Sequence, residues 1–288
     1  MGRNLYKVLA SAGLVAGSAA WATPLAPAAW AAPTTHAGLS ATHAGPTRTA
    51  GGVLVPAFAH ETLPLHGGTA TSLNWSGYAV TPGSGVTGVT TQFVVPSASL
   101  LPPGFAATWA GIGGYNTSDL IQAGVGENSA PSNPLLGPQY YAWYELLPAS
   151  ETAITGCTGD PTCAVTPGDK VSVDISQASA NQWDISMADG SKWTWSKQVT
   201  YASSGSSAEW ILEAPTVAAQ TVLADVGTVR FGSNDTYTAG GATHTIASGN
   251  PTMIDLGTGV LNEATSSALA ADGESFNDCA YALSCPTP

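Results

Sequence analysis

Ser207-Ala208-Glu209-Trp210-Ile211-Leu212-Glu213-Ala214-Pro215 is the stretch that decides the fold, because it predicts one buried β-strand that carries a carboxylate. Alternation along a strand places Glu209, Ile211 and Glu213 on one face and the residues between them on the other. A carboxylate on a face shared with apolar residues is costly unless it is paired or used in chemistry. The stretch therefore predicts a β-sheet with a functional acid on one face.

A second strand, Asp119-Leu120-Ile121-Gln122-Ala123-Gly124-Val125, carries a matching polar residue. Ile121, Ala123 and Val125 share one face, and Gln122 points the opposite way between Leu120 and Gly124. A carboxylate and a carboxamide on the same face of a sheet form a candidate hydrolytic site. Gln122 and Glu209 are therefore the candidate catalytic residues.

The rest of the chain predicts an all-β fold. Short runs rich in Val, Ile, Thr, Trp and Tyr alternate with clusters of Gly, Pro, Ser and Asn, and Asp189-Gly190 is a strong hairpin signal. We predict a sandwich of two antiparallel sheets, with one helical turn near 214–221 as the only departure from strand and loop. The predicted strands span 75–80, 86–95, 107–112, 120–125, 139–146, 170–177, 182–187, 192–200, 208–212, 221–231 and 254–256.

The N-terminal region predicts export. Arg3 and Lys7 precede an apolar run, and Ala20-Trp21-Ala22 offers a cleavage site, so residues 1–22 read as a secretory signal peptide, with an alternative end near residue 31. Residues 23–68 are rich in Ala, Pro, Thr, Gly and His and lack hydrophobic periodicity, so they cannot order alone. They are either a linker or a propeptide, and we expect residues 69–288 to form one catalytic domain that is secreted.

Charge and cysteine content narrow the function. Residues 69–288 hold four basic residues against 18 of the 19 acidic ones, which argues against nucleic acid or anionic membrane as a partner and fits a protein built for acid. The four cysteines form two local pairs, which in a secreted chain predict the disulfides Cys157–Cys163 and Cys279–Cys285. We expect a monomer that needs no metal or cofactor.

The inventory of catalytic residue types leaves carboxylates, amides and hydroxyls. His244 is the one histidine of the predicted domain, in a Gly-rich loop, and no zinc, paired-aspartate or phosphate-loop signature is present. Two hydrolytic reactions commonly use carboxylates on a secreted β-sandwich: peptide hydrolysis and glycoside hydrolysis. In Tyr141-Ala142-Trp143-Tyr144-Glu145, one face carries Tyr141, Trp143 and Glu145, a strip typical of a cleft floor, although ordinary cross-strand packing gives the same pattern.

Six ordered motifs resemble the glutamic peptidases, the eqolisin family of secreted acid endopeptidases. The family patterns are Asn-Trp-x-Gly, Trp-x-Gly-Ile-Asp-Gly, the segments of the catalytic glutamine and glutamate, Ala-Trp-Tyr-Glu-x-x-Pro, and a segment near the end. Their counterparts here are Asn74–Gly77, Trp109–Gly114, Leu120–Gly124, Ala142–Pro148, Ala208–Glu213 and Met253–Asp255. The resemblance covers nearly all of the predicted domain.

The resemblance implies a sandwich of two curved antiparallel sheets, a concanavalin-like jelly roll, with the site on the concave face. It implies that Glu209 is a general base that activates water and then protonates the leaving nitrogen. Gln122 would donate its amide N–H to the oxyanion, since a neutral amide keeps its proton at any pH. Activity is expected at about pH 2 to 5, around the ordinary pKa of a glutamate, on polypeptide substrates and without sensitivity to pepstatin.

Substrate contacts are carried over to Trp109, Trp143, Glu145 and Trp75. Two departures from the family pattern stand out: Gly113 replaces the family aspartate, and Leu146-Leu147 replaces aromatic residues. Both predict an altered substrate preference, and the first an altered pH profile.

Three further hypotheses stay open. The chain is alternatively a glycoside hydrolase or lectin, with sugar platforms at Trp109, Trp143, Trp183, Trp193 and Trp195 and, for hydrolysis, Glu145 and Glu209 facing each other at roughly 5 to 10 Å. A catalytically inactive relative with a binding role is the second. The third concerns the leader, which as a propeptide would block the cleft, with four histidines that charge below about pH 6.5 and alter its docking.

Overall fold

The structure is a computed structural model that describes residues 53–55, 57, 63–64, 67–130, 137–217, 219–258 and 261–288. Within these ranges the chain forms strands, loops and one short 3-10 helix, and no α-helix. The strands are β1 (Thr69–Ser72), β2 (Trp75–Val80), β3 (Val86–Val94), β4 (Phe105–Gly113), β5 (Leu120–Asn128), β6 (Gln139–Leu146), β7 (Thr152–Ala153), β8 (Lys170–Ser179), β9 (Gln182–Asp189), β10 (Trp193–Thr200), β11 (Ala208–Glu213), β12 (Thr216–Val217), β13 (Ala219–Gln220), β14 (Thr228–Phe231), β15 (Thr236–Ala239), β16 (Ala242–Thr245), β17 (Thr252–Gly257), β18 (Asn262–Ser266) and β19 (Phe276–Ala280).

The first layer is a sheet in the order β7-β6-β5-β4-β11-β2-β17-β1. All its pairs are antiparallel except β1–β17, which is parallel. Strand β11 lies between β4 and β2, so a segment from late in the chain fills the middle of a sheet built from early segments. This insertion places Glu209 in the sheet that carries Gln122.

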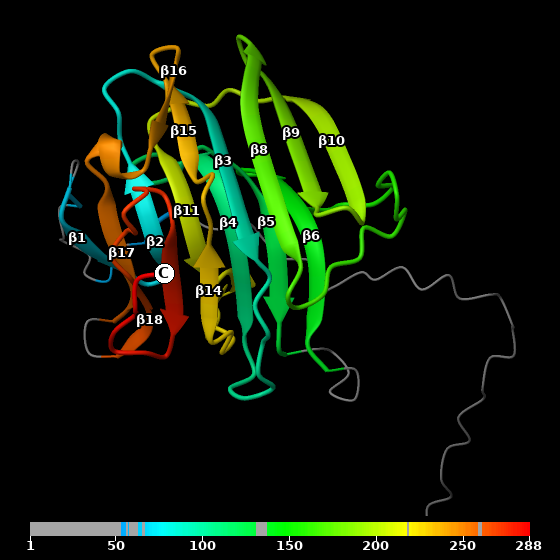
Figure 1. Ribbon diagram of the computed structural model, residues 1–288, viewed down its shortest axis with the longest axis vertical. Coiled ribbons are helices and arrows are strands. Elements are labelled where there is room, and N and C mark those ends of the chain that lie inside the picture. Colours follow the sequence, from blue (N-terminus) through cyan, green and yellow to red (C-terminus); the bar gives the residue numbers. More distant parts are fainter. Residues whose placement is uncertain are drawn as a thin grey trace, which may run out of the picture. The chain divides into compact units, whose positions relative to one another are not determined.

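The second layer runs β10-β9-β8-β3, and β3 then pairs with β15 along one part and β14 along another. Strand β16 extends β15, while β19 and β18 extend β14. The two layers overlie one another in Figure 1 and are joined where β17 pairs with β18 at a bulge next to Gly257. The predicted sandwich is confirmed.

Two apolar clusters lie on the two faces of the first sheet. The larger fills the sandwich and takes Ile121, Ala123 and Val125 from β5 together with Ala208, Trp210 and Leu212 from β11. The smaller lies on the opposite face of the same sheet and contains Trp109, Leu120 and Ile211. The alternation predicted for both strands is therefore confirmed, and Gln122 and Glu209 face away from the sandwich core.

Most predicted strands match observed ones, and the Asp189-Gly190 hairpin joins β9 to β10. Both predicted disulfides are present, Cys157–Cys163 and Cys279–Cys285. Two predictions are wrong. The helical turn near 214–221 is a small hairpin of β12 and β13, because these residues bond to each other across a turn. The strand predicted over 221–231 begins only at Thr228, and residues before it form loop apart from a single bridge at Leu223.

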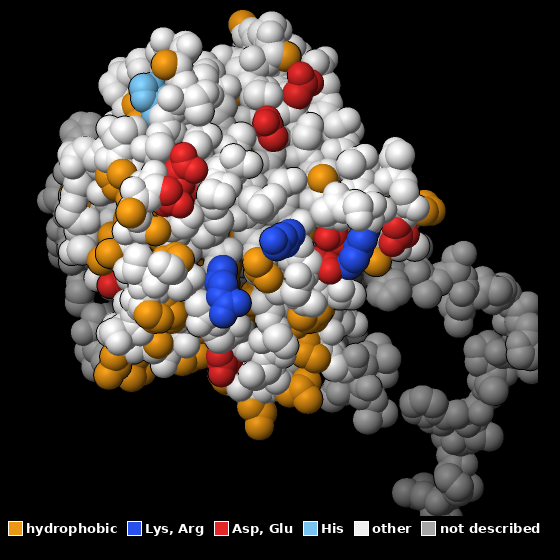
Figure 2. Space-filling view, in the orientation of Figure 1, with side chains coloured by type: hydrophobic (Ala, Val, Ile, Leu, Met, Phe, Trp, Pro, Cys, Tyr) orange, Lys and Arg blue, Asp and Glu red, His pale blue; other side chains and the backbone are white. Residues whose placement is uncertain are grey.

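The surface of the described residues carries few cations. Figure 2 shows isolated Lys and Arg side chains among uncharged and acidic ones. Among the described residues no helix is long and apolar enough to cross a membrane. The predicted signal peptide and most of the leader, including its four histidines, lie outside the described residues.

Candidate active site

One row of paired residues crosses the first sheet and carries the candidate site. Glu209 on β11 pairs with Gly111 on β4, Gly111 pairs with Gln122 on β5, and Gln122 pairs with Glu145 on β6. Paired residues point their side chains to the same face. Because Gly111 has no side chain, Glu209 and Gln122 face each other across two strand spacings, about 10 Å between backbones.

The next rows of this face combine large side chains with glycines. In the neighbouring row Trp109 and Trp143 flank Gly124, and a β-carbon on Gly124 would lie 2.2 Å from the Thr108 carbonyl oxygen and 2.6 Å from Trp109 Cβ. In the row beyond it, the ring of Tyr141 lies over Gly126. The glycines of β5 thus leave room for aromatic rings from both neighbouring strands.

Glu209 is fully buried among these groups. Burial raises the pKa of Glu209 well above its ordinary value, the nearby Ser207 hydroxyl lowers it in part, and the negative charge of Asp119 raises it further. Neither carboxylate oxygen accepts a hydrogen bond of normal geometry, so Ser207 moderates the cost of burial without removing it. Burial in this state thus favours the neutral form of the Glu209 carboxyl.

Gln122 is also fully buried, and its Nε2 donates a hydrogen bond of 2.6 Å to Glu145 Oε2. Gln122 Oε1 has no hydrogen-bond partner among the described residues. The amide therefore has one fixed donor, while its second N–H and its oxygen remain for other partners.

Trp109 and Trp75 form the apolar part of the site. Their rings pack edge to face with centroids 5.0 Å apart, and Trp109 Nε1 donates to Glu213 Oε2 at 2.9 Å. The far corner of the Trp109 ring approaches Gly111, since a β-carbon there would lie 2.9 Å from Cζ3. Glu213 thus fixes the indole that borders the gap between Gln122 and Glu209.

The turn after β4 folds back over this face. Gly113 and Gly114 have φ of 88° and 96°, a backbone conformation that favours glycine. A side chain at Gly113 would collide, because its β-carbon would lie 2.6 Å from the Asp119 carbonyl oxygen and 3.1 Å from Asp119 Oδ2. Asp119 is held by the backbone N–H of Ser204 at 2.6 Å. A carboxylate of this chain therefore lies beside the position where the family pattern has its aspartate.

Part of the leader lies on the same face. Leu54 is buried in the cluster that contains Trp109, and Val53 and Leu63 pack against that cluster. The Leu54 N–H donates to the Gly114 carbonyl at 3.2 Å, and the Tyr115 hydroxyl donates to the Pro64 carbonyl at 2.8 Å. The site in this state is closed by the β4–β5 turn and by residues of the leader.

The predicted residues come together to different degrees. Gln122, Glu145 and Glu209 share one row, while Trp109 and Trp143 share the next, and Trp75 lies against Trp109. Leu147 joins the cluster on this face, whereas Leu146 packs against the sandwich core. Tyr115, Glu213 and Asp119 were not predicted as site residues. Glu213 shares the Glu209 face by alternation and offered a signal, whereas the fold-back of Tyr115 had none beyond Gly113-Gly114.

The alternative sites are weaker. Trp183 and Trp193 belong to the core inside the sandwich, so they offer no platform to a sugar, whereas Trp195 is partly buried against that core. Gln122, and not a second acid, is the next side chain along the row from Glu209. His244 lies on β16 with its ring stacked on Tyr237, in a strand rather than the predicted loop.

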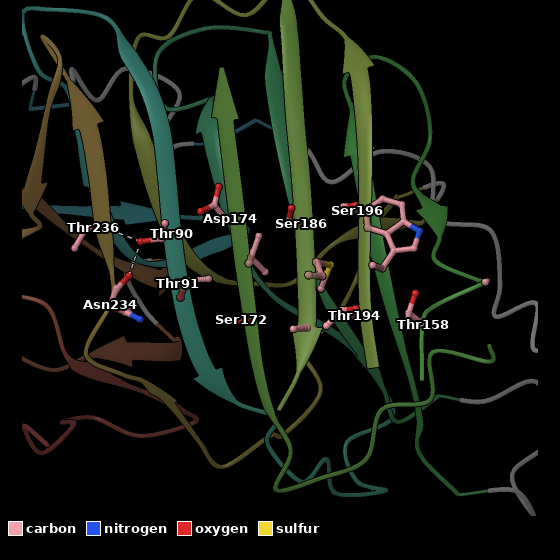
Figure 3. A pocket seen from close by; sticks show the side chains of 15 residues that line it. Thr90, Thr91, Thr158, Ser172, Asp174, Ser186, Thr194, Ser196, Asn234 and Thr236 are labelled. Atoms are coloured by element: carbon pink, nitrogen blue, oxygen red, sulfur yellow. Dashed lines mark hydrogen bonds between the residues drawn. The ribbon is translucent and has the colours of Figure 1, made fainter. Parts of the chain in front are cut away.

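A separate groove of about 750 Å³ lies on the second sheet (Figure 3). Hydroxyl side chains of Thr90, Ser172, Ser186 and Ser196 and the carboxylate of Asp174 line it, and none of the predicted catalytic residues does. Among the described residues no cluster of three or more His, Cys, Asp or Glu side chains could hold a metal ion. The row through Glu209 therefore remains the candidate site, although its face is packed rather than open.

Comparisons with known proteins agree with the motifs. Scytalido-glutamic peptidase, solved with a transition-state analogue inhibitor, matches 73% of this chain and 98% of its own length at 17% identity and a TM-score of 0.57. SCP-B, a member of the eqolisin family solved with the tripeptide Ala-Ile-His, matches the same shares at 17% identity and a TM-score of 0.55. At this identity the two structures establish the fold alone.

A search of curated proteins finds no match. The family comparison is decisive, because residues 73–276, most of the chain, match the description "Peptidase A4 family". The chain belongs to the Peptidase A4 family, the glutamic peptidases that its motifs predicted.

Proposed function

We propose that this protein is a secreted acid endopeptidase in which Glu209 and Gln122 form the catalytic pair. The observation that carries the proposal is the row in which these two side chains flank Gly111. A substrate peptide bond above Gly111 would have an acid on one side and an amide on the other. Trp109, Trp143 and Trp75 would bind the substrate side chains.

The reaction begins with Glu209 ionised and a water molecule beside it. Glu209 takes a proton from the water, whose oxygen attacks the scissile carbonyl carbon. The second N–H of Gln122 donates to the carbonyl oxygen as it becomes negative, and a neutral amide can do this at any pH. Collapse of the tetrahedral intermediate breaks the C–N bond, and Glu209 returns the proton to the leaving nitrogen. Catalysis needs Glu209 to titrate near the working pH, so activity should lie at acid pH.

The leader would be an internal inhibitor. Leu54 and Leu63 pack against the cluster that contains the site tryptophans, and Gln122 and Glu209 have no exposed surface. A substrate cannot reach a fully buried carboxylate, so cleavage or displacement of the leader would have to precede activity. Its removal would also rehydrate Glu209 and lower the carboxyl pKa toward its ordinary value. Residues 1–22 as signal peptide, residues 23–68 as leader and residues 69–288 as catalytic domain complete this proposal.

The test is cleavage of a denatured protein by the full chain, preincubated in acid, from about pH 2 to 7 with pepstatin present. Wild type should cleave in acid, and Glu209→Gln and Gln122→Ala should lose about 100-fold or more. Glu274→Gln, in the loop before β19 and outside this row, serves as the matched control. Full proteolysis by Glu209→Gln would refute the assignment.

A further inference from the structure

Glu145 is the third polar side chain of the row, and its contact with Gln122 differs from the role the motif suggested. The family resemblance implied that Glu145 contacts substrate. In the structure Glu145 is 1% exposed and pairs directly with Gln122, with 2.6 Å between Glu145 Oε2 and Gln122 Nε2. This distance is slightly shorter than the usual range for N–H···O hydrogen bonds in proteins, about 2.7–3.2 Å.

The chemistry of the two groups makes this contact directional. An ionised carboxylate only accepts hydrogen bonds, whereas an amide presents donors at its nitrogen and acceptors at its oxygen. Of the two orientations of the Gln122 amide, only the one with Nε2 toward Glu145 forms this bond. The nitrogen's other N–H then points away from Glu145, as does Oε1.

The backbone on both sides of this pair is held in register. The Tyr201 hydroxyl accepts from the Leu120 N–H at 2.7 Å and donates to the Leu147 carbonyl at 2.9 Å. The Leu147 N–H donates to the Leu120 carbonyl at 2.9 Å. Leu120 is two residues from Gln122, and Leu147 is two residues from Glu145. These three hydrogen bonds therefore limit sliding of β5 against β6. With the register of the two strands fixed, the hydrogen bond from Gln122 Nε2 to Glu145 Oε2 holds the amide group in one position.

We propose that Glu145 is a positioning residue that fixes the amide of Gln122, with one N–H bound to Glu145 and the other directed toward the gap over Gly111. This inference rests on the proposed function, because the value of a fixed amide lies in its use as the oxyanion donor. Glu145 acts through Gln122 and does not touch the reacting atoms. It is thus a determinant of rate rather than of substrate affinity.

The kinetic test compares Glu145→Gln and Glu145→Ala with wild type and with Glu274→Gln. A positioning role predicts that kcat falls about 10-fold in Glu145→Gln, whose amide can still accept but allows both orientations, and about 100-fold in Glu145→Ala. KM should stay within about 3-fold in both. A raised KM with unchanged kcat would return Glu145 to the role of substrate contact and overturn the inference.

A second measurement does not depend on activity. Side-chain amide signals of the full chain labelled with ¹⁵N-glutamine report on Gln122, and loss of a signal in Gln122→Ala assigns it. We expect two widely separated N–H proton shifts for Gln122 in wild type, which converge in Glu145→Ala while Glu274→Gln leaves them unchanged. Signals unchanged in Glu145→Ala would refute the contact. If the contact is seen and wild type shows no proteolysis, the proposed function fails while the geometry stands.

Discussion

Gly111→Ala tests whether the gap between Gln122 and Glu209 is where the peptide bond sits. The new β-carbon would lie 2.9 Å from Trp109 Cζ3, 3.0 Å from the Ile121 carbonyl oxygen and 3.0 Å from Leu120 Cδ1. Ordinary carbon contacts are about 3.5 Å or longer, so roughly 0.5 Å must be gained. Part of that shift falls on the backbone of β5 next to Gln122, since the Ile121 oxygen belongs to it.

The expected cost has two parts. Overpacking a rigid site costs about 1–3 kcal/mol of unfolding free energy, and a catalytic group displaced by about 1 Å costs up to about 100-fold in rate. A displacement of half that size, together with the methyl group in the gap, should lower kcat/KM about 10- to 100-fold. The fold should survive, because this cost is smaller than the stability of a typical domain, about 5–15 kcal/mol.

The assay is hydrolysis of a quenched fluorescent peptide in acid, with Tm measured on the same samples. Gly126→Ala is the matched control: it adds the same methyl to the same face, where it meets the ring of Tyr141 at 2.6 to 2.8 Å. Tyr141 is partly buried and can swing, so this variant should keep activity within about 3-fold. If Gly111→Ala retained wild-type kcat/KM at unchanged Tm, the gap over Gly111 would not be the reaction site.

Three further predictions concern pH and the leader. Burial raises the pKa of Asp278 and of Asp235 well above the usual value, so the folded state holds these protons more tightly than the unfolded state. Their stabilising contribution is therefore complete below about pH 4 and is lost as pH rises through the raised values, so Tm should fall from acid toward neutral pH, less steeply in Asp278→Asn. Leu54→Asp should weaken the docking of the leader by about 2 kcal/mol or more. The intact variant should then hydrolyse substrate, which the intact wild type does not. An intact variant as inactive as the intact wild type would contradict occlusion of the site by the leader. Asp119→Asn removes a charge that raises the pKa of Glu209, so the acid limb of the kcat/KM profile should move to lower pH, and an unmoved limb would show that the two groups are not coupled.

Local pattern was enough to assign side chains to faces. The period of two along buried strands is independent of what the strands pair with, so Glu209 and Gln122 could be placed opposite the core before their neighbours were known. The short strands β15, β16, β18 and β19 escaped prediction, because each has only four or five residues and polar residues interrupt its apolar pattern. The two disulfides each join cysteines six positions apart, so their pairing needed no tertiary information.

Relations across strands could not be predicted in the same way. The row Glu209–Gly111–Gln122 depends on β11 entering between β4 and β2, and nothing local in any of the three strands specifies this order. The same holds for the bond from Trp109 to Glu213, whose residues are 104 positions apart. The family resemblance led us to expect that Glu145 contacts substrate, and only the register reveals that Gln122 is its neighbour.

The leader residues Val53, Leu54 and Leu63 are ordered by contacts with the folded domain and not by their own sequence. The composition of the leader gives no reason to order alone, yet Val53, Leu54 and Leu63 find apolar partners on the site face. Burial of these side chains against the aromatic face removes apolar surface from water and offsets the conformational entropy that the leader residues lose. A face that binds extended polypeptide can also hold the chain's own N-terminal segment, so under the proposed function substrate binding and inhibition by the leader would draw on one set of contacts.

The order of groups in the row bears on the proposed role of Glu209 as both base and acid. Two adjacent carboxylates would share a proton and titrate as a pair. Here an amide stands between them: Glu209 and Glu145 are three strands apart, about 14 Å between backbones, where at an effective dielectric constant near 20 their repulsion is about 1 kcal/mol. The hydrogen bond between Glu145 and Gln122 therefore need not change when Glu209 gains or loses a proton. Replacing Gln122 by Glu would put a second carboxyl group directly beside Glu145 and remove the neutral amide donor in one step, so that variant should lose more activity than Gln122→Ala.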